Sequence, residues 1–188
     1  MMQTKEISKE VFYADEPLVN VGGQDIEFLK ARVGNTERKR IRLCAHKDVE
    51  DNLHEMFIVL SEETYIRPHK HLSKAESLHI VEGDADAVFF DERGSITHVI
   101  TLGDYSSGRR FYYRVDVPVY HTLLIRSDPF IFHETTQGPF RRSDTAFPLW
   151  APEESDVVAA REYMERLAKV VSDILLTQTT VPEGGGGR

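Results

Sequence analysis

The sequence predicts a mainly β protein in which short antiparallel strands form a sandwich or barrel, with one helix before the strands and one after them. Short apolar runs recur at nearly regular spacing from residue 41 to residue 134, and turn sequences such as Asp91-Glu92-Arg93-Gly94 separate them. Helical periodicity is confined to the two ends of the chain. We expect an N-terminal arm and helix over residues 1–40, a barrel over 41–150, and a C-terminal helix with a disordered tail over 151–188.

The N-terminal residues predict an arm followed by a helix. Residues 1–20 show little periodicity, and Val11-Phe12-Tyr13 is either a short strand or an arm that packs on a neighbouring copy. Helical spacing begins at Asp25, a good N-cap residue, and Gly34-Asn35 is a helix stop. Four apolar residues share one stripe of this helix: Ile26, Phe28, Leu29 and Val33. We expect the helix to lie outside the main body as a cover.

The predicted strands of the barrel differ in their patterns. Met56-Phe57-Ile58-Val59-Leu60 is continuously apolar, as expected for a strand buried on both faces. Residues 96–102 alternate, which places Ile96, His98, Ile100 and Leu102 on one side. The other strands are expected at residues 41–45, 77–82, 85–90, 111–117, 121–126 and 130–134.

The C-terminal part predicts a long amphipathic helix. Pro152 suits its first turn, and apolar residues at helical spacing continue to Leu175. After Thr177 the tail, Val181-Pro182-Glu183 followed by glycines, has nothing to bury, so we expect it to be disordered.

Composition excludes some classes of function. The formal net charge is −8, from 31 acidic and 23 basic residues, which disfavours a nucleic-acid partner. The basic run Arg38-Lys39-Arg40 with Arg42 is interpreted as a solvated face. No stretch approaches the ~18 apolar residues of a membrane span, and the polar start favours a cytoplasmic location. The single cysteine, Cys44, is interpreted as a small buried hydrophobe.

The residues most informative about function are His69, His71 and Glu76. Two histidines two apart on an extended chain point to the same face, because side chains alternate along a strand. A tight turn over residues 72–75 can bring Glu76 to the same site. Imidazoles with a carboxylate suit a divalent transition metal, so this spacing predicts a metal site.

His121 is the predicted fourth ligand. It begins a strand after the bend expected at Pro118, and Leu123 and Ile125 share its face as core residues. It lies 45 residues after Glu76, as a barrel requires if a ligand is to come from the opposite strand.

These residues carry a family resemblance. The spacing from His69 through Glu76 to Gly83 resembles the first cupin motif, and Pro118 with His121 resembles a shortened second motif. Further matches narrow the resemblance, over roughly residues 40–155, to the WbuC family of cupin-fold metalloproteins within the RmlC-like superfamily; they are Pro68-His69-Lys70-His71, Lys74-x-Glu76, Phe90-Asp91-x-x-Gly94, Tyr120-His121, Glu134-Thr135-x-x-Gly138-Pro139-Phe140 and Trp150-Ala151-Pro152-Glu153. Glu63 and Ile125 depart from the usual glycine and asparagine.

The resemblance implies a cupin double-stranded β-helix, a jelly-roll barrel that holds one metal in its mouth through three histidines and a glutamate. Members of the WbuC family occur among bacterial O-antigen and surface-polysaccharide genes. Cupins commonly pair through an edge strand or an N-terminal arm, so we expect a homodimer.

Three further sets of candidate residues each allow two interpretations. Glu134 ends an apolar strand and is either a general base in the pocket or a surface carboxylate. Lys74 and Arg67 either bind an anionic substrate or are solvated. Tyr120 either lies in the pocket mouth or packs. We expect His98 to be a core or rim histidine and Trp150 to plug the barrel end.

Three functions remain open for such a site. The first is a metal-dependent isomerase or epimerase acting on a sugar or sugar nucleotide, with Glu134, Lys74 and Tyr120 as catalytic candidates. The second is a metal-dependent dioxygenase, and the third is a non-catalytic module that senses a sugar or a metal. The metal can be Fe, Zn, Mn or Ni, and the expected partner is a small-molecule substrate such as an anionic sugar.

Overall fold

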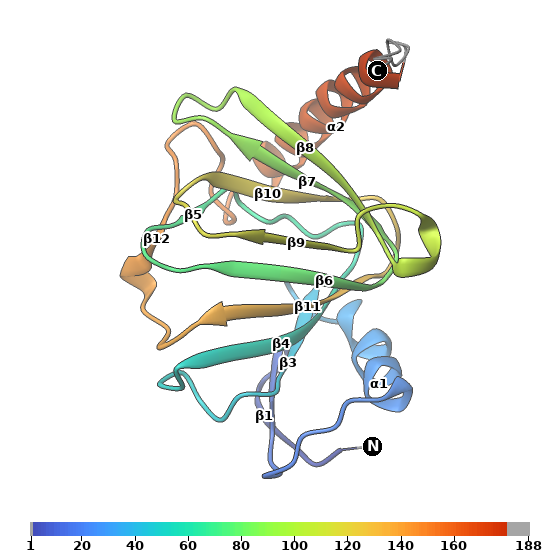
Figure 1. The fold of residues 1–188 in the computed structure, drawn as a ribbon, viewed down its shortest axis with the longest axis vertical. Coiled ribbons are helices and arrows are strands. Elements are labelled where there is room, and N and C mark those ends of the chain that lie inside the picture. Colours follow the sequence, from blue (N-terminus) through green and yellow to red (C-terminus); the bar gives the residue numbers. More distant parts are fainter. Residues whose placement is uncertain (1, 180–188) are drawn as a thin grey trace, which may run out of the picture.

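The computed structural model describes residues 2–179 and confirms a mainly β protein with one helix before the barrel and one after it (Figure 1). The predicted disorder of residues 181–188 lies outside the described residues. The elements are, in chain order, β1 (Thr4–Ser8), β2 (Val11–Ala14), α1 (Gly23–Val33), β3 (Arg40–Cys44), β4 (Leu53–Leu60), β5 (Lys70–His71), β6 (Glu76–Glu82), β7 (Asp84–Phe90), β8 (Ile96–Gly103), β9 (Tyr112–Val115), β10 (Tyr120–Ile125), β11 (Phe130–Gln137), β12 (Thr145–Ala146) and α2 (Val157–Thr179).

Two walls of strands enclose the interior. One wall is a sheet in the order β1-β2-β3-β4-β11-β6-β9, and the other combines the sheet β10-β7-β8 with the short pair β12-β5. Strands far apart in the sequence pair antiparallel, as β4 does with β11 and β7 with β10. This connectivity is that of a double-sheet jelly roll, the cupin fold that the sequence predicts.

The barrel interior is apolar because alternate residues of each wall point into it. In β11, Phe130 and Phe132 face the interior, whereas Ile131 faces outward. The interior cluster draws residues from both walls: Leu60, Leu78, Ile80, Ala85, Ala87, Phe89, Leu102, Tyr113, Leu123, Ile125, Phe130 and Phe132. By the same alternation, Glu134 faces the interior two residues after Phe132.

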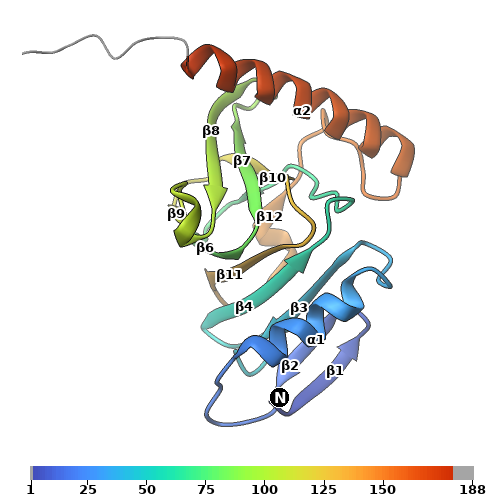
Figure 2. The same ribbon diagram turned by 90° about the vertical axis from the view of Figure 1, so that its right-hand side faces the viewer.

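Each helix covers the outer face of one wall (Figure 2). Leu29 and Val33 of α1 pack with outward residues of β3 and β4, including Ile41 and Val59. On the opposite side, α2 covers the β7 and β10 face with Leu167 and Val171. No helix among residues 2–179 is both long and apolar enough to cross a membrane.

The short strand that was one alternative for Val11-Phe12-Tyr13 is present as β2, but the hairpin it forms with β1 and the start of α1 differ from the expectation. Residues 4–14 form a β hairpin, and β2 pairs in parallel with β3, so this segment extends the larger sheet of its own chain. Helix α1 begins at Gly23, and Asp25 is its third residue rather than its N-cap. The reason is that the Asp25 carboxylate reaches back and accepts hydrogen bonds from the backbone N–H of Gly22 at 2.9 Å and of Met2 at 2.8 Å.

Two further expectations were wrong in detail. A bulge in the pairing of β7 with β8 moves Ile96 to the outer face under α2, whereas Leu102 stays in the interior. Pro152 precedes α2, which begins at Val157, because Asp156 caps the helix by accepting a hydrogen bond from the Ala159 N–H at 3.0 Å.

Candidate metal centre

An isolated backbone bridge places His69 beside His121. The His69 N–H donates to the His121 carbonyl at 3.1 Å, and the His121 N–H donates to the His69 carbonyl at 2.9 Å. Residues paired directly across antiparallel strands have their side chains on the same face. The two rings therefore lie side by side, with centroids 4.6 Å apart.

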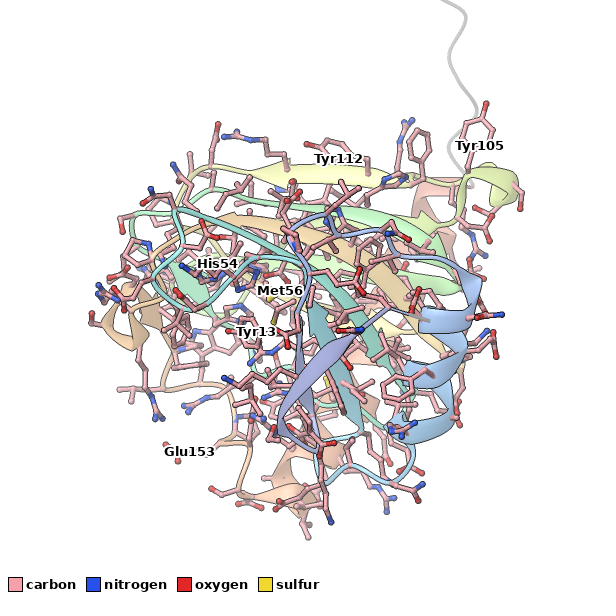
Figure 3. The ribbon with its side chains drawn as sticks, turned by 90° about the horizontal axis from the view of Figure 1, so that it is seen from below. Tyr13, His54, Met56, Tyr105, Tyr112 and Glu153 are labelled. Carbon is pink, nitrogen blue, oxygen red and sulfur yellow. The ribbon has the colours of Figure 1, made fainter. Side chains whose placement is uncertain are left out.

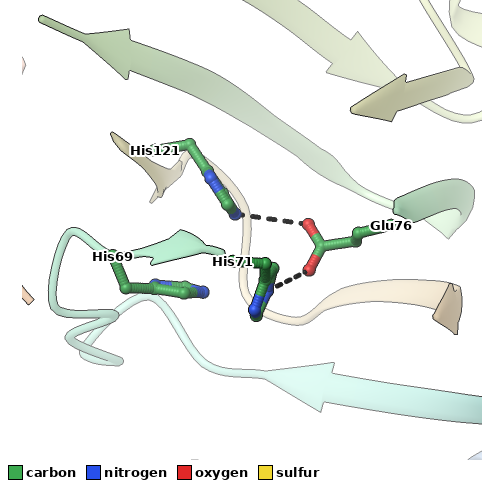
Figure 4. A group of neighbouring side chains, drawn as sticks. All are labelled: His69, His71, Glu76 and His121. Atoms are coloured by element: carbon green, nitrogen blue, oxygen red, sulfur yellow. Dashed lines mark hydrogen bonds and ion pairs between the residues drawn. The ribbon is translucent and has the colours of Figure 1, made fainter. Parts of the chain in front are cut away.

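His71 and Glu76 complete the cluster from two directions. His71 follows His69 by two residues and shares its face, while Glu76 opens β6 on the opposite wall with the inward parity of Leu78. Figure 4 shows the four side chains converging. One ligand atom from each of the four lies within 4.8 Å of the others, so the group can hold a metal ion.

Backbone carbonyls fix how two of the imidazoles present their nitrogens. Nδ1 of His69 lies 2.9 Å from the Arg67 carbonyl, and Nδ1 of His121 lies 3.0 Å from the Val119 carbonyl. A carbonyl only accepts, so each Nδ1 carries a proton. The Nε2 atoms are thereby directed toward the cluster, the second-sphere arrangement typical of metal-binding histidines.

The electrostatics of the cluster favour a cation. Burial lowers the pKa of His69 to about 3, with the nearby His121 adding to the effect, so its ring is neutral and able to bind a metal. Burial acts to raise the pKa of Glu76, but His121 and His71 outweigh it and hold that pKa well below its usual range. Glu76 is therefore a buried carboxylate among imidazoles, with Oε2 2.9 Å from His71 Nε2.

The residues present fit a divalent transition metal. Among residues 2–179, Nε2 of His121 is buried and has no hydrogen-bond partner, although it lies 3.3 Å from Glu76 Oε1. A buried nitrogen without a partner is costly unless a ligand satisfies it. The ligand atoms of the four side chains all lie within 4.8 Å of one another, so a single ion between them can satisfy this nitrogen.

Glu134 shares a pocket with His69. The pocket has a volume of about 220 Å³, and its walls include Ile58, Phe132 and Ile66 as well as these two side chains. The Glu134 carboxyl makes no hydrogen bond or ion pair within residues 2–179. Burial, with a smaller contribution from the Glu76 charge, raises its pKa to about 8, while Arg42 acts in the opposite direction.

The two basic residues predicted to bind an anion both have partners in residues 139–153, although Arg67 Nε is buried without a hydrogen-bond partner in the described chain. Lys74 Nζ donates to the Pro139 carbonyl at 2.6 Å and lies 3.6 Å from Asp144 Oδ2. Arg67 donates to the Pro148 carbonyl at 3.3 Å and lies 3.5 Å from Glu153, which stands at the edge of the molecule in Figure 3. Their partners come from residues 139–153, so both side chains fasten that segment to the barrel.

The structure does not bring Tyr120 to the four side chains. It precedes His121 and therefore points to the opposite face of β10, where it packs against Trp150 with ring centroids 5.8 Å apart. Trp150, which was expected to plug the barrel end, instead packs in the cluster under α2. His98 is exposed on β8 and is therefore not a core residue, which leaves the rim alternative. Cys44 is buried, as expected.

Sequence reasoning missed three residues near the site. Arg40 and Arg42 line the pocket. Ile41 and Leu43, which alternate with them along β3, pack under α1, so the two arginines lie on the opposite face of the strand. The alternation Arg-Ile-Arg-Leu was the available signal, and the interpretation of this run as a solvated face was incomplete. Tyr113 is buried in the interior, where burial and then the charges of Glu76 and Glu134 raise its pKa well above the usual value.

Residues 23–102, less than half of the chain, match a family described as a domain of unknown function (DUF6016). No curated protein matches the sequence.

Several solved structures resemble the barrel. The L-ribose isomerase of Cellulomonas parahominis has a TM-score of 0.45 and 13% identity over 57% of this chain and 69% of that chain. The salicylate 1,2-dioxygenase of Pseudoaminobacter salicylatoxidans has a TM-score of 0.43 and 15% identity over 58% of this chain and 29% of that chain. The capsular polysaccharide assembling protein CapF of Staphylococcus aureus has a TM-score of 0.44 and 14% identity over 57% of this chain and 31% of that chain.

This chain covers only part of many similar structures. It spans 66% of the protein SO0799 of Shewanella oneidensis, 25% of the oxalate decarboxylase OxdC of Bacillus subtilis and 31% of CapF. At these identities none of the activities named for those proteins carries over to this chain.

Proposed function

We propose that this protein is a metal-dependent isomerase or epimerase that acts on a sugar. The observation that carries the proposal is that Glu134 and His69 line the same pocket. A divalent metal bound by His69, His71, Glu76 and His121 would polarise a substrate carbonyl or hydroxyl. The chain itself then has to supply a group that takes a proton from one carbon and returns it.

Glu134 is suited to that proton transfer. Its carboxyl faces the pocket and has no hydrogen-bonding partner within residues 2–179, so it is available to a substrate. A pKa near 8 makes both the acid and the carboxylate accessible near neutral pH, which favours a group that both accepts and donates a proton. Glu134 would remove a proton from the carbon next to the carbonyl, leaving an enediolate whose negative charge lies on the former carbonyl oxygen. The same proton would then be returned to the former carbonyl carbon while one hydroxyl proton moves between the two oxygens, so no atom is gained or lost.

The biological setting rests on the family resemblance. The resemblance to the WbuC family supports a role in bacterial surface-polysaccharide (O-antigen) biosynthesis, with the sugar or sugar nucleotide as substrate. A cytoplasmic location and a homodimer stay predictions. The edge strand β1, whose five residues are all exposed, is the element through which a second copy could pair.

Hydrogen exchange tests the proposed reaction. The metal-loaded protein, incubated in D₂O without oxygen with a set of aldoses, ketoses and their phosphates, should introduce deuterium next to the carbonyl of one of them, as followed by NMR. Glu134→Gln should slow that exchange by about 100-fold or more. Glu165→Gln, a change of an exposed glutamate on α2, should leave it unchanged.

The alternatives give different results in the same experiment. Oxygen uptake that depends on a substrate, with no deuterium incorporated, would identify a dioxygenase instead. Sugar binding with neither exchange nor oxygen uptake would identify a non-catalytic binding module.

A further inference from the structure

Three arginines line the same pocket as His69 and Glu134, and they differ in their partners. Arg38 Nε donates to Glu10 Oε2 at 2.8 Å, and Arg40 lies 3.3 Å from Glu154 Oε1. Arg42 has no hydrogen bond from its side chain and no ion pair within residues 2–179. Of these three cations, Arg42 is therefore the one whose charge no carboxylate of the described chain neutralises.

The position of Arg42 is set by the strand. Ile41 and Leu43 are fixed under α1, both almost completely buried, so Arg42 must point to the opposite face of β3. That face lines the pocket, and Arg42 is close enough to Glu134 for its charge to lower the pKa of that carboxyl. A guanidinium at this place offers paired N–H donors to an oxyanion.

The size of the pocket limits what fits. Its volume of about 220 Å³ lies below the roughly 300–1,000 Å³ of pockets that enclose drug-sized ligands. A monosaccharide with one anionic group is therefore better matched than a sugar nucleotide, whose base and ribose would have to lie outside.

We propose that Arg42 binds the anionic group of the substrate, a carboxylate or phosphate on a single sugar, while the sugar extends toward Glu134 and His69. This inference rests on the proposed function for the reacting end of the pocket. It moves anion recognition from Lys74 and Arg67, which residues 139–153 already engage, to a residue whose guanidinium is available.

Calorimetric titration of the full chain as purified tests Arg42. The probes are D-glucose 6-phosphate, D-glucuronate, uncharged D-glucose and UDP-glucose. At least one of the two small anions should bind more tightly than glucose, and the one that does identifies the oxyanion. Arg42→Gln should weaken that binding by about tenfold, as expected for losing a charged hydrogen bond. Arg161→Gln, which removes an exposed arginine of α2, should change it less than about twofold.

Several results would overturn the inference. These are equal binding of glucose and the small anions, no binding of either anion, unchanged binding in Arg42→Gln, or tighter binding of UDP-glucose than of both small anions. The proposed reaction fails separately, through the absence of deuterium exchange. Anion binding that depends on Arg42 without exchange would contradict the isomerase but support the binding site.

Discussion

At the scale of single residues, Gly83 shows how closely the two walls are joined. It links β6 to β7 with φ +84°, a left-handed conformation that favours glycine. A Cβ at this position would lie 2.2 Å from Ser127 Oγ and 2.5 Å from the Pro129 carbonyl oxygen. Ser127 Oγ is itself held, because it accepts a hydrogen bond from the Asp84 N–H at 2.8 Å and donates one to Pro129 at 2.9 Å.

Gly83→Ala is expected to destabilise the fold. The left-handed conformation and the clash with backbone should together cost about 2 kcal/mol or more in the free energy of unfolding. Urea denaturation followed by circular dichroism measures the change. Gly34→Ala is the matched control, since Gly34 has helical dihedral angles and no atom within 4 Å of the added Cβ. It should change stability by less than about 1 kcal/mol. Equal losses in both variants would contradict the steric explanation.

The residue scale also shows what the sequence could and could not predict. His69, His71 and Glu76 lie within one short segment, so their spacing and the strand alternation were enough to place them together. Lys74 and Arg67 were different, because their partners lie more than 60 residues away and no local pattern indicates them. The position of Arg42 in the pocket could not be predicted without knowing which face of β3 is covered by α1.

At the scale of elements, α1 depends on one carboxylate. Asp25 accepts hydrogen bonds from Gly22 and Met2, which fastens both the helix start and the first described residue of the chain. Burial acts to raise the pKa of Asp25, but these backbone hydrogen bonds outweigh it, so the pKa lies below the ordinary 3.8. The sequence predicted the helix and its stop at Gly34; it missed the start because Asp25 suits both the N-cap and the third helical position.

Asp25→Asn should remove a pH-dependent part of the stability. Because the folded pKa of Asp25 is depressed, its contribution is complete above the unfolded value and is lost as pH falls through the folded value. The wild type should exceed the variant by about 1 kcal/mol at pH 7, and the gap should narrow below about pH 5. Asp173→Asn, an exposed change on α2, should leave the pH profile unaltered. A constant gap from pH 7 to about pH 3 would contradict this assignment.

At the scale of the whole molecule, the site exists because the two walls meet there. His71 and His121 come from one wall and Glu76 from the other, so folding of the barrel assembles a cluster that neither wall holds alone. The regular spacing of short apolar runs and turn sequences predicted the barrel. The hairpin β1–β2 was not predicted. Only β2 pairs with β3, so β1 stays exposed and its sequence shows no apolar alternation. Tyr105 and Tyr112 are exposed and project from the outside of the barrel (Figure 3).

The metal centre is the central claim, and elemental analysis of the purified protein tests it most directly. The protein should be prepared without a metal-chelating column, alongside His121→Ala and the control His79→Ala, whose ring is exposed on the outer face of β6. We predict one divalent transition metal ion per chain in the wild type and in His79→Ala, and at least about a tenfold lower content in His121→Ala with unchanged circular dichroism. A wild type without metal, or a His121→Ala variant that keeps its metal, would contradict the account.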